Sequence, residues 1–227
     1  MKHFPYYPIF IDVENHDVVI VGGGDVCARK AETMMRYGAR VTIVSPEFTS
    51  EIEQWAQDGK LALRRKRYES SDLDGASIVI ASTNDTSVNE QVAVDARARK
   101  LPVNVVDVPR LCEFIVPAII EKGSVTIAVS TGGKSPALAR TLKEDLYRSI
   151  GPEYAEANDI LGTLRDGAKE VLPTDIDRKN FFDSLIAAGI IEMLREGRRD
   201  EAYSTIARMC EAAGVPLSRE VHSGIGS

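Results

Sequence analysis

The stretch VVIVGGGDVCARKAETMMRYGARVTIVSP, residues 18–46, decides the fold of this chain. An apolar run leads directly into Gly22, Gly23 and Gly24, a segment of helical character follows, and a second β-branched run ends at Pro46. A strand, a glycine-rich turn, a helix and a second strand about 20 residues later are typical of a dinucleotide-binding unit. We therefore expect a Rossmann-type sheet whose turn presents backbone N–H groups to a pyrophosphate.

The glycine turn departs from the usual GxGxxG pattern at its third position. Gly22 and Gly24 fill the first two positions, and Cys27 stands where a small residue lets the helix pack on the strand. A tight turn without a ligand would need the same glycines, so the motif alone leaves a purely structural role open. Asp25 is equally open, because an acid suits both the positive end of a helix and a contact with the cofactor.

The acid that commonly binds the cofactor's ribose is missing, because the second strand ends at Val44-Ser45-Pro46. Ser45 can bond a ribose hydroxyl but neither repels nor attracts a 2′-phosphate, which favours NAD over NADP only slightly. Another strand end contributes Thr83 and Asn84, although Asn84 with Asp85 equally suits a turn and a helix cap. The residues predicted to bind NAD are Gly22, Gly23, Gly24, Asp25, Val26, Ser45, Pro46, Glu47, Thr83 and Asn84.

Strand-like and helical segments alternate up to about residue 110, which predicts an α/β fold with a parallel sheet. The expected strands are 17–21, 40–45, 77–82 and 102–106, with LALRRKRYE at 61–69 as a third strand or edge segment. Ser50 and Glu53 have the spacing of a capping box and predict a helix that ends near Gly59.

The pattern changes after Pro109. Two apolar runs, 114–120 and 124–130, flank Glu121-Lys122-Gly123 and predict a hairpin, and Ser135 and Pro136 then cap and open a helix. Further helices are expected at 153–171, 175–196 and 199–213. The hairpin runs FIVPAII and VTIAVS are too hydrophobic for a free sheet edge, which favours dimerisation there. We expect a Rossmann domain (1–110), a dimerisation region of hairpin and helix (111–150) and a helical C-terminal domain (151–227).

The composition is that of an ordinary soluble protein, with 44% hydrophobic and 27% charged residues. A net charge of −6 argues against broad nucleic-acid binding, and no apolar run is long enough to cross a bilayer. Without a signal-peptide pattern, the cytoplasm is the expected location. The three cysteines have neither disulfide nor zinc-site spacing, so we predict no bound metal.

Asp107 is the best candidate for acid–base chemistry. It directly follows an apolar strand, where ligands of parallel sheets bind, and partial burial there would tune a carboxylate for proton transfer. A role as the cap of the turn before Pro109 is equally compatible with its spacing. The three histidines, His3, His16 and His222, lie near the chain ends or before the first predicted strand. None of them is well placed for catalysis.

A second polar constellation is STGGKSP, residues 130–136. Its glycines allow backbone conformations that other residues avoid, and Lys134 adds a positive charge. The following helix points unpaired N–H groups outward, so the loop suits a carboxylate or phosphate. An N-capped helix after a glycine turn would have the same sequence. The residues predicted to contact an anionic substrate are Thr131, Gly132, Gly133, Lys134, Ser135 and Arg140.

Four blocks of the chain resemble the precorrin-2 dehydrogenase and sirohydrochlorin ferrochelatase family, which includes the N-terminal module of siroheme synthase. The blocks are YYPIFIDVENHDVVIVGGGDVCARKAETM (6–34), ASTNDTSVNEQV (81–92), VNVVDVPRLCEFIVPAII (103–120) and VTIAVSTGGKSPALARTLKEDL (125–146). The resemblance implies a homodimer that uses NAD to oxidise precorrin-2 to sirohydrochlorin. It implies that Asp107, in the NVVD motif, is the functional residue for dehydrogenation and, in bifunctional members, for metal insertion.

Two departures from the family limit what the resemblance implies. Thr131 stands where some members have a serine that can be phosphorylated, so that regulation is not assumed here. The length of 227 residues leads us to expect the stand-alone form, without a fused methyltransferase. Insertion of Fe²⁺ or Co²⁺ stays open. Two alternatives remain: a non-catalytic NAD- or tetrapyrrole-binding protein, and an ordinary alcohol dehydrogenase, which would need a Tyr-x-x-x-Lys motif or a core histidine.

Overall fold

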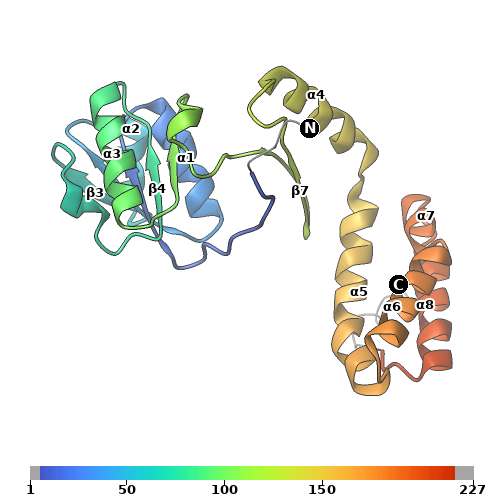
Figure 1. The fold of residues 1–227 in the computed structure, drawn as a ribbon. Helices are drawn as coiled ribbons and strands as arrows, with labels where there is room; N and C mark the ends of the chain where they lie inside the picture. Colours follow the sequence, from blue (N-terminus) through green and yellow to red (C-terminus); the bar gives the residue numbers. More distant parts are fainter. Residues whose placement is uncertain (1–5, 218–227) are drawn as a thin grey trace. The chain divides into compact units, whose positions relative to one another are not determined.

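The computed structural model describes residues 6–217, which divide after Val116 into two compact units (Figure 1). The first unit contains a parallel sheet with its helices, and the second contains an antiparallel hairpin followed by helices. The expected α/β class, with a Rossmann-type sheet, a hairpin and C-terminal helices, is confirmed. The division into three domains, with boundaries at residues 110 and 150, stays a prediction.

The sheet of the first unit is wholly parallel, and its strand order reverses next to β1. The strands are β1 (Asp17–Val21), β2 (Arg40–Ser45), β3 (Ala62–Arg65), β4 (Ile78–Ala81) and β5 (Val103–Val105), in the order β3-β2-β1-β4-β5. The chain leaves β1 toward β2 and β3 and returns on the other side as β4 and β5. Ligands of open parallel sheets bind beyond the strand ends at such a switch point.

Side chains that alternate along the strands form a separate core on each face of this sheet. Val18 and Ile20 pack with α1 (Asp25–Arg36) and α2 (Ser50–Gln57) on one face. Val19 and Val21 pack with α3 (Thr86–Ala98) and the 3-10 turn η1 (Ser70–Leu73) on the other. Continuous apolar runs such as residues 18–21 are therefore strands that are buried on both faces.

The capping box expected at Ser50 and Glu53 is wrong by one residue. Thr49 is the N-cap of α2, because its hydroxyl accepts a hydrogen bond from the backbone N–H of Ile52 at 3.4 Å. Two adjacent hydroxyl residues can each cap a helix, so the sequence could not choose between them. Glu53 instead forms an ion pair at 2.6 Å with Arg65, the last residue of β3 (Ala62–Arg65).

The second unit begins with the antiparallel strands β6 (Ala118–Lys122) and β7 (Val125–Val129). Its helices are α4 (Pro136–Ser149), α5 (Pro152–Val171), α6 (Asp175–Ala187), α7 (Ile190–Arg195) and α8 (Arg199–Ala213). The single helix predicted over 175–196 is wrong. Gly189 has φ of 80° and separates α6 from α7, since this left-handed conformation ends a helix.

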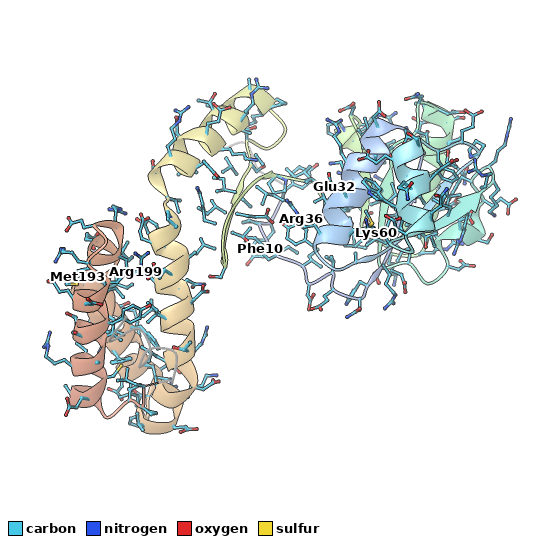
Figure 2. All side chains as sticks on the ribbon, turned by 180° about the vertical axis from the view of Figure 1, so that it is seen from behind. Phe10, Glu32, Arg36, Lys60, Met193 and Arg199 are labelled. Atoms are coloured by element: carbon cyan, nitrogen blue, oxygen red, sulfur yellow. The ribbon has the colours of Figure 1, made fainter. Side chains whose placement is uncertain are left out.

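Helices α5 to α8 enclose a core of their own, in which Leu164, Leu185, Ile190 and Ile206 are fully buried. Figure 2 shows Arg199 at the start of α8, from which it reaches Glu156 of α5 at 2.9 Å. No helix within residues 6–217 is long and apolar enough to span a membrane.

A second ion pair, less exposed than that of Arg199 with Glu156, joins α7 to the start of α5. Arg195 donates from Nε to Oε1 of Glu153 at 2.9 Å, and the Glu153 side chain is only 7% exposed. Burial alone would raise the pKa of Glu153, but the hydrogen bond from Arg195, backbone N–H groups and the Arg195 charge outweigh it, so the net pKa is lowered. The ionised form of Glu153 therefore stabilises this end of the bundle.

This pair predicts a pH-dependent stability. A lowered folded pKa contributes stability that is fully present above the ordinary value of 4.5 and is lost as pH falls from there through the lowered pKa. We expect Glu153→Gln to decrease the free energy of unfolding at neutral pH, and the deficit against wild type to shrink as the pH falls below 4.5 and through the lowered pKa of Glu153. Urea unfolding followed by circular dichroism at several pH values measures both.

The matched control is Glu156→Gln. Its pair with Arg199 joins the same bundle, but its side chain is 24% exposed, so its deficit should be smaller. A Glu153→Gln deficit that does not change with pH would show that packing, and not the charge, stabilises this site.

Candidate functional site

A cavity of about 930 Å³ lies at the carboxyl edge of the parallel sheet, within the first unit. It is lined by the ends of β1, β2 and β4 and by the loops that follow them, which is the switch point of the sheet. All ten residues predicted to bind the cofactor line this cavity: Gly22, Gly23, Gly24, Asp25, Val26, Ser45, Pro46, Glu47, Thr83 and Asn84.

The first two glycines permit close approaches between neighbouring backbones. Gly22 has φ of 130°, and a Cβ there would lie 2.7 Å from the carbonyl oxygen of Ser82. A Cβ on Gly23 would lie 1.8 Å from the carbonyl oxygen of Glu47, and the Gly23 carbonyl accepts a bond from Thr49 N–H at 2.9 Å. The glycine turn is thus held directly against the segment that follows β2.

Gly24 is different, because the described protein atoms leave space around it. An added Cβ would meet no described atom within 4 Å, although Gly24 lines the cavity. Gly24 is the N-cap of α1 and has no side chain with which to cap the helix. The first N–H groups of α1 are therefore left for water or a ligand, and the helix adds partial positive charge at this point.

The other two helices at the cavity are capped by side chains. Thr49 caps α2, and Asp85 caps α3 by accepting from the N–H groups of Ser87 and Val88 at 2.9 and 3.3 Å. The helix cap that the sequence allowed at Asn84 and Asp85 is thus formed by Asp85. Among α1, α2 and α3, only α1 therefore begins without a side-chain cap at the cavity wall.

The wall that follows β4 is held by Asn89, which the sequence reasoning missed. Its side chain accepts from the N–H of Thr83 at 3.2 Å and donates to the Thr83 carbonyl at 2.9 Å. Asn89 is only 6% exposed, so this reciprocal pair fixes the Thr83 backbone at the cavity. A polar residue in the first turns of a helix gives no sign of this role without the fold.

Eight further lining residues besides Asp85 were not singled out from the sequence. They are Val21, Val44, Phe48, Thr49, Arg67, Tyr68, Ser82 and Val88. Half of them (Val21, Val44, Phe48 and Ser82) directly adjoin predicted residues along the chain, so the ends of the predicted strands could have indicated these four. Arg67 and Tyr68 come from the segment after β3, whose position depends on strand order.

Cys27, at the third glycine position, is fully buried beneath this turn. Burial raises the pKa of its thiol to about 11, and a hydrogen bond with Ser82 only partly offsets this. The thiol therefore stays protonated at neutral pH. It acts as a small packing residue between α1 and the sheet, as the sequence indicated.

Asp107 lies just beyond the end of β5, at the same edge of the sheet as the cavity. It has φ of 60°, which is rare for a residue other than glycine. The partial burial expected of Asp107 is wrong for the chain as described, because its side chain is exposed. Beyond β5 the chain leaves the sheet in a turn, so the apolar strand does not cover the carboxylate.

The backbone around Asp107 is fixed by a partly buried network of hydrogen bonds. The Cys112 thiol bonds both the N–H and the carbonyl of Val105, at 3.2 and 3.1 Å, and Asn104 donates to the Phe114 carbonyl at 2.9 Å. These contacts connect β5 to the chain beyond η2 (Pro109–Leu111) and enclose the turn that carries Asp107. The unusual conformation of Asp107 is thus imposed by its surroundings.

Lys30, on α1, adds a positive charge near this turn. Burial and the charge of Arg29 lower the pKa of Lys30, while the charges of Asp107 and Cys112 act in the opposite direction. Lys30 is half-buried and lies within electrostatic range of Asp107, so a positive and a negative side chain lie near each other at this turn.

The residues predicted to contact the substrate belong to the second unit. Ser135 caps α4 by accepting from Leu138 N–H at 3.1 Å, and Pro136 is the first helical residue, as expected. The Thr131 hydroxyl donates to the Ser135 carbonyl at 3.0 Å, so it serves the loop itself. Gly132 and Gly133 adopt φ of 64° and 75°, and Lys134 and Arg140 are exposed.

Among the described residues, neither a histidine nor a metal-binding cluster adds a second site. His16 is an exposed turn residue before β1, and His3 and His222 lie outside the described residues. Within residues 6–217, no group of three His, Cys, Asp or Glu side chains is arranged to hold a metal ion.

Two family models match the chain in the order of its parts. Residues 9–118 match a family described as NAD(P)-binding, and residues 122–149 match one described as "Sirohaem biosynthesis protein central". The first segment spans the sheet and its cavity, and the second spans most of the hairpin and α4. The first unit is therefore an NAD(P)-binding domain.

Known proteins of one kind match nearly the whole chain. The siroheme synthase of Psychrobacter sp. (strain PRwf-1) is 37% identical over 93% of this chain and 44% of its own length. That of Pseudomonas entomophila (strain L48) is 36% identical over 96% of this chain and 47% of its own length, so the chain spans less than half of these relatives.

A solved structure titled "SirC, precorrin-2 dehydrogenase" superimposes with a TM-score of 0.73 and 26% identity, covering 89% of this chain and 100% of that one. The matched segments, the relatives and the superposition agree with the motifs of the sequence. The chain therefore belongs to the family that siroheme synthases and precorrin-2 dehydrogenases share.

Proposed function

We propose that this protein is a precorrin-2 dehydrogenase, which oxidises precorrin-2 to sirohydrochlorin with NAD. The observation that carries the proposal is a cavity with an uncapped helix N-terminus at the switch point of the sheet, and with Asp107 at the same edge. The names of the similar proteins, siroheme synthase and precorrin-2 dehydrogenase, support the choice of substrate.

The residues present fit a dinucleotide. The cavity of about 930 Å³ is near the upper end of the usual range for small-molecule sites, about 300–1,000 Å³. The free N–H groups at the start of α1 suit a pyrophosphate, and the open space at Gly24 lets it approach the backbone. Ser45 and Glu47 offer a hydroxyl and a carboxylate to a ribose. When bound, NAD supplies a hydride acceptor.

The glycine turn provides a direct test of cofactor binding. Gly24→Ala should leave stability nearly unchanged, because the new Cβ meets no protein atom, yet weaken NAD binding about 10-fold or more by filling the space for the pyrophosphate. Isothermal titration calorimetry and thermal unfolding measure the two effects.

Gly162→Ala is the matched control, since a Cβ there also meets no described atom and the residue, on α5, does not line the cavity. It should leave NAD affinity unchanged, while alanine inside the helix should raise stability by about 1 kcal/mol or less. Equal NAD affinity of Gly24→Ala and wild type would place the cofactor elsewhere.

We propose Asp107 as the base that accepts the proton released when precorrin-2 loses a hydride. A carboxylate at the carboxyl edge of the sheet can reach a ligand that lies over the strand ends. The network of Cys112 and Asn104 holds the turn, and Lys30 of α1 lies within electrostatic range of Asp107.

Asp107→Asn tests this role with little effect on the backbone, because asparagine tolerates the left-handed conformation of this residue. We expect kcat to fall about 100-fold or more, in the usual range for loss of a general base, with NAD affinity unchanged. The assay follows NADH and the sirohydrochlorin spectrum under anaerobic conditions. Full activity of Asp107→Asn would rule out the carboxylate as the base.

The same assay distinguishes the alternatives. Wild type that binds NAD and the tetrapyrrole without turnover would favour the non-catalytic binding protein. Addition of Fe²⁺ or Co²⁺ to sirohydrochlorin tests metal insertion, for which Asp107 would accept the pyrrole protons. An insertion rate no higher than that of the non-enzymatic reaction would exclude the second activity.

We propose that the loop of residues 131–135 and Arg140 bind carboxylates of the tetrapyrrole. Precorrin-2 carries many carboxylates, whereas the protein has a net charge of −6, so binding needs local cations. Lys134 and Arg140 are exposed and flank the N-terminus of α4, whose helix dipole also favours anions. A KM for precorrin-2 that is unchanged by Lys134→Gln would contradict this assignment.

We propose that the protein is a homodimer formed through the hairpin and α4. A lone two-stranded sheet is only marginally stable in water, and none of the 14 residues of α4 is buried within the described chain. Leu138 and Leu142, one turn apart on α4, are 51% and 40% exposed. This apolar face is therefore available to a second copy of the chain.

Leu142→Glu should convert the dimer to a monomer in sedimentation velocity, because a charge on this face would be buried at the interface. Thr141→Glu places the same charge on the adjacent exposed residue and should leave the dimer intact. A wild-type protein that sediments as a single chain would overturn the proposal.

A further inference from the structure

The side chains that line the cavity carry more negative than positive charge, which disfavours the phosphates of a dinucleotide. Three acidic side chains line it, those of Asp25, Glu47 and Asp85. Among the lining residues, Arg67 alone carries a basic side chain. It is therefore the one cationic side chain in the wall of the cavity that can pair with a phosphate of the ligand.

Arg67 ends a run of four basic residues, 64–67, whose other three members pair with carboxylates. Arg64 bonds Asp72 at 3.2 Å, Arg65 bonds Glu53 at 2.6 Å, and Lys66 bonds Glu69 at 2.9 Å. Within residues 6–217, Arg67 has no such ion pair. Its charge is the smallest of the interactions that lower the pKa of Asp85, after the Ser87 side chain and the backbone N–H groups. Its exposed guanidinium is thus available to a ligand.

The backbone that carries Arg67 is fixed on both sides. Lys66 pairs with Glu69 and also with Asp72, the latter at 3.1 Å, while the Tyr68 hydroxyl donates to Asp95 at 2.8 Å. Burial and the bond to Asp95 raise the pKa of Tyr68, so its hydroxyl remains a donor. Arg67 is presented to the cavity from a backbone segment that its neighbours hold, so only its side chain has to be ordered on binding.

The strand register places Arg67, which follows β3, beside the segment that follows β2. Strands β2 and β3 are parallel neighbours, and Ser45 is directly opposite Arg65. Arg67, two residues further, therefore lies beside the segment that continues from Ser45 to Glu47. In dinucleotide-binding sheets the ribose 2′ position of the adenosine lies beyond the end of this strand, where an acid selects the free hydroxyl and an Arg accommodates a 2′-phosphate.

We infer that Arg67 is a specificity-determining residue of the cofactor site, which binds a phosphate on the adenosine ribose and lets the site accept NADP as well as NAD. The guanidinium presents a fork of N–H donors that suits a phosphate group. Glu47 lies on the same side and opposes Arg67, because its carboxylate repels a 2′-phosphate. The inference rests on the dinucleotide site of the proposed function but not on its substrate.

Titration of NAD and NADP separately into wild type and Arg67→Gln, followed by calorimetry, tests the inference. In wild type the two dissociation constants should agree within about 10-fold, since Arg67 compensates for the 2′-phosphate. Loss of a charge-assisted contact should weaken NADP binding by about 10-fold to 100-fold and NAD binding by about 3-fold or less. The fragments 2′,5′-ADP and 5′-AMP should show the same difference.

Two further variants sharpen the result. Glu47→Gln should shift the ratio in the opposite direction, toward NADP, because it removes the repulsive charge. Arg65→Gln, on the same segment but paired with Glu53 and outside the cavity lining, should leave the ratio of the two affinities at its wild-type value.

The outcomes separate this inference from the proposed function. An unchanged ratio of NADP to NAD affinity in Arg67→Gln would overturn the role of Arg67, even if the enzyme oxidises precorrin-2. Wild type that binds NAD but not NADP would also overturn it. Failure of both dinucleotides to bind wild type would instead reject the cofactor site itself.

Discussion

The close approach of two backbone segments fixes the shape of the cavity in the first unit. Gly23 and the Glu47 carbonyl lie so near each other that a Cβ would come within 1.8 Å of that oxygen, and Thr49 bonds the Gly23 carbonyl at 2.9 Å. This contact ties the turn after β1 to the segment after β2. It closes one side of the cavity and leaves the N-terminus of α1 directed at its interior. Any side chain at Gly23 would separate the two walls.

The polar groups around the cavity divide into those that the protein satisfies and those that it leaves for a ligand. Thr49 and Asp85 cap α2 and α3, and Asn89 binds the Thr83 backbone. The start of α1 has no such side chain, and Arg67 has no ion pair within residues 6–217. A dinucleotide brings phosphates to both features, so the same molecule would complete two unsatisfied parts of one wall.

The second unit contains both a buried core and apolar surface that the described chain leaves uncovered. Its helices α5 to α8 have a buried core, with Leu164 and Leu185 fully enclosed, whereas the hairpin and α4 keep apolar side chains half-exposed. Hydrophobic surface of this kind is stable in water only when it is covered. The proposed dimer would cover it. The anion-binding loop lies at the start of α4, so dimerisation and substrate binding would depend on the same helix.

The sequence by itself determined the strand and helix order of the first unit, the glycine turn and ten of the residues that line the cavity. These features depend on local spacing: buried parallel strands read as continuous apolar runs, and side chains at their carboxyl ends share one edge of the sheet. The sequence also indicated Ser135 as the cap of α4, since a hydroxyl before Pro136 has a direct local meaning.

Only the tertiary structure decided which of two adjacent hydroxyl residues caps α2, that Gly189 divides a helix, and that Asp107 is exposed. Each choice depends on φ or on neighbours distant in sequence, which no local pattern encodes. The role of Arg67 shows this most clearly, because four basic residues in a row look alike in the sequence. The register of β2 with β3 and the carboxylates opposite the other three leave Arg67 alone to face the cavity.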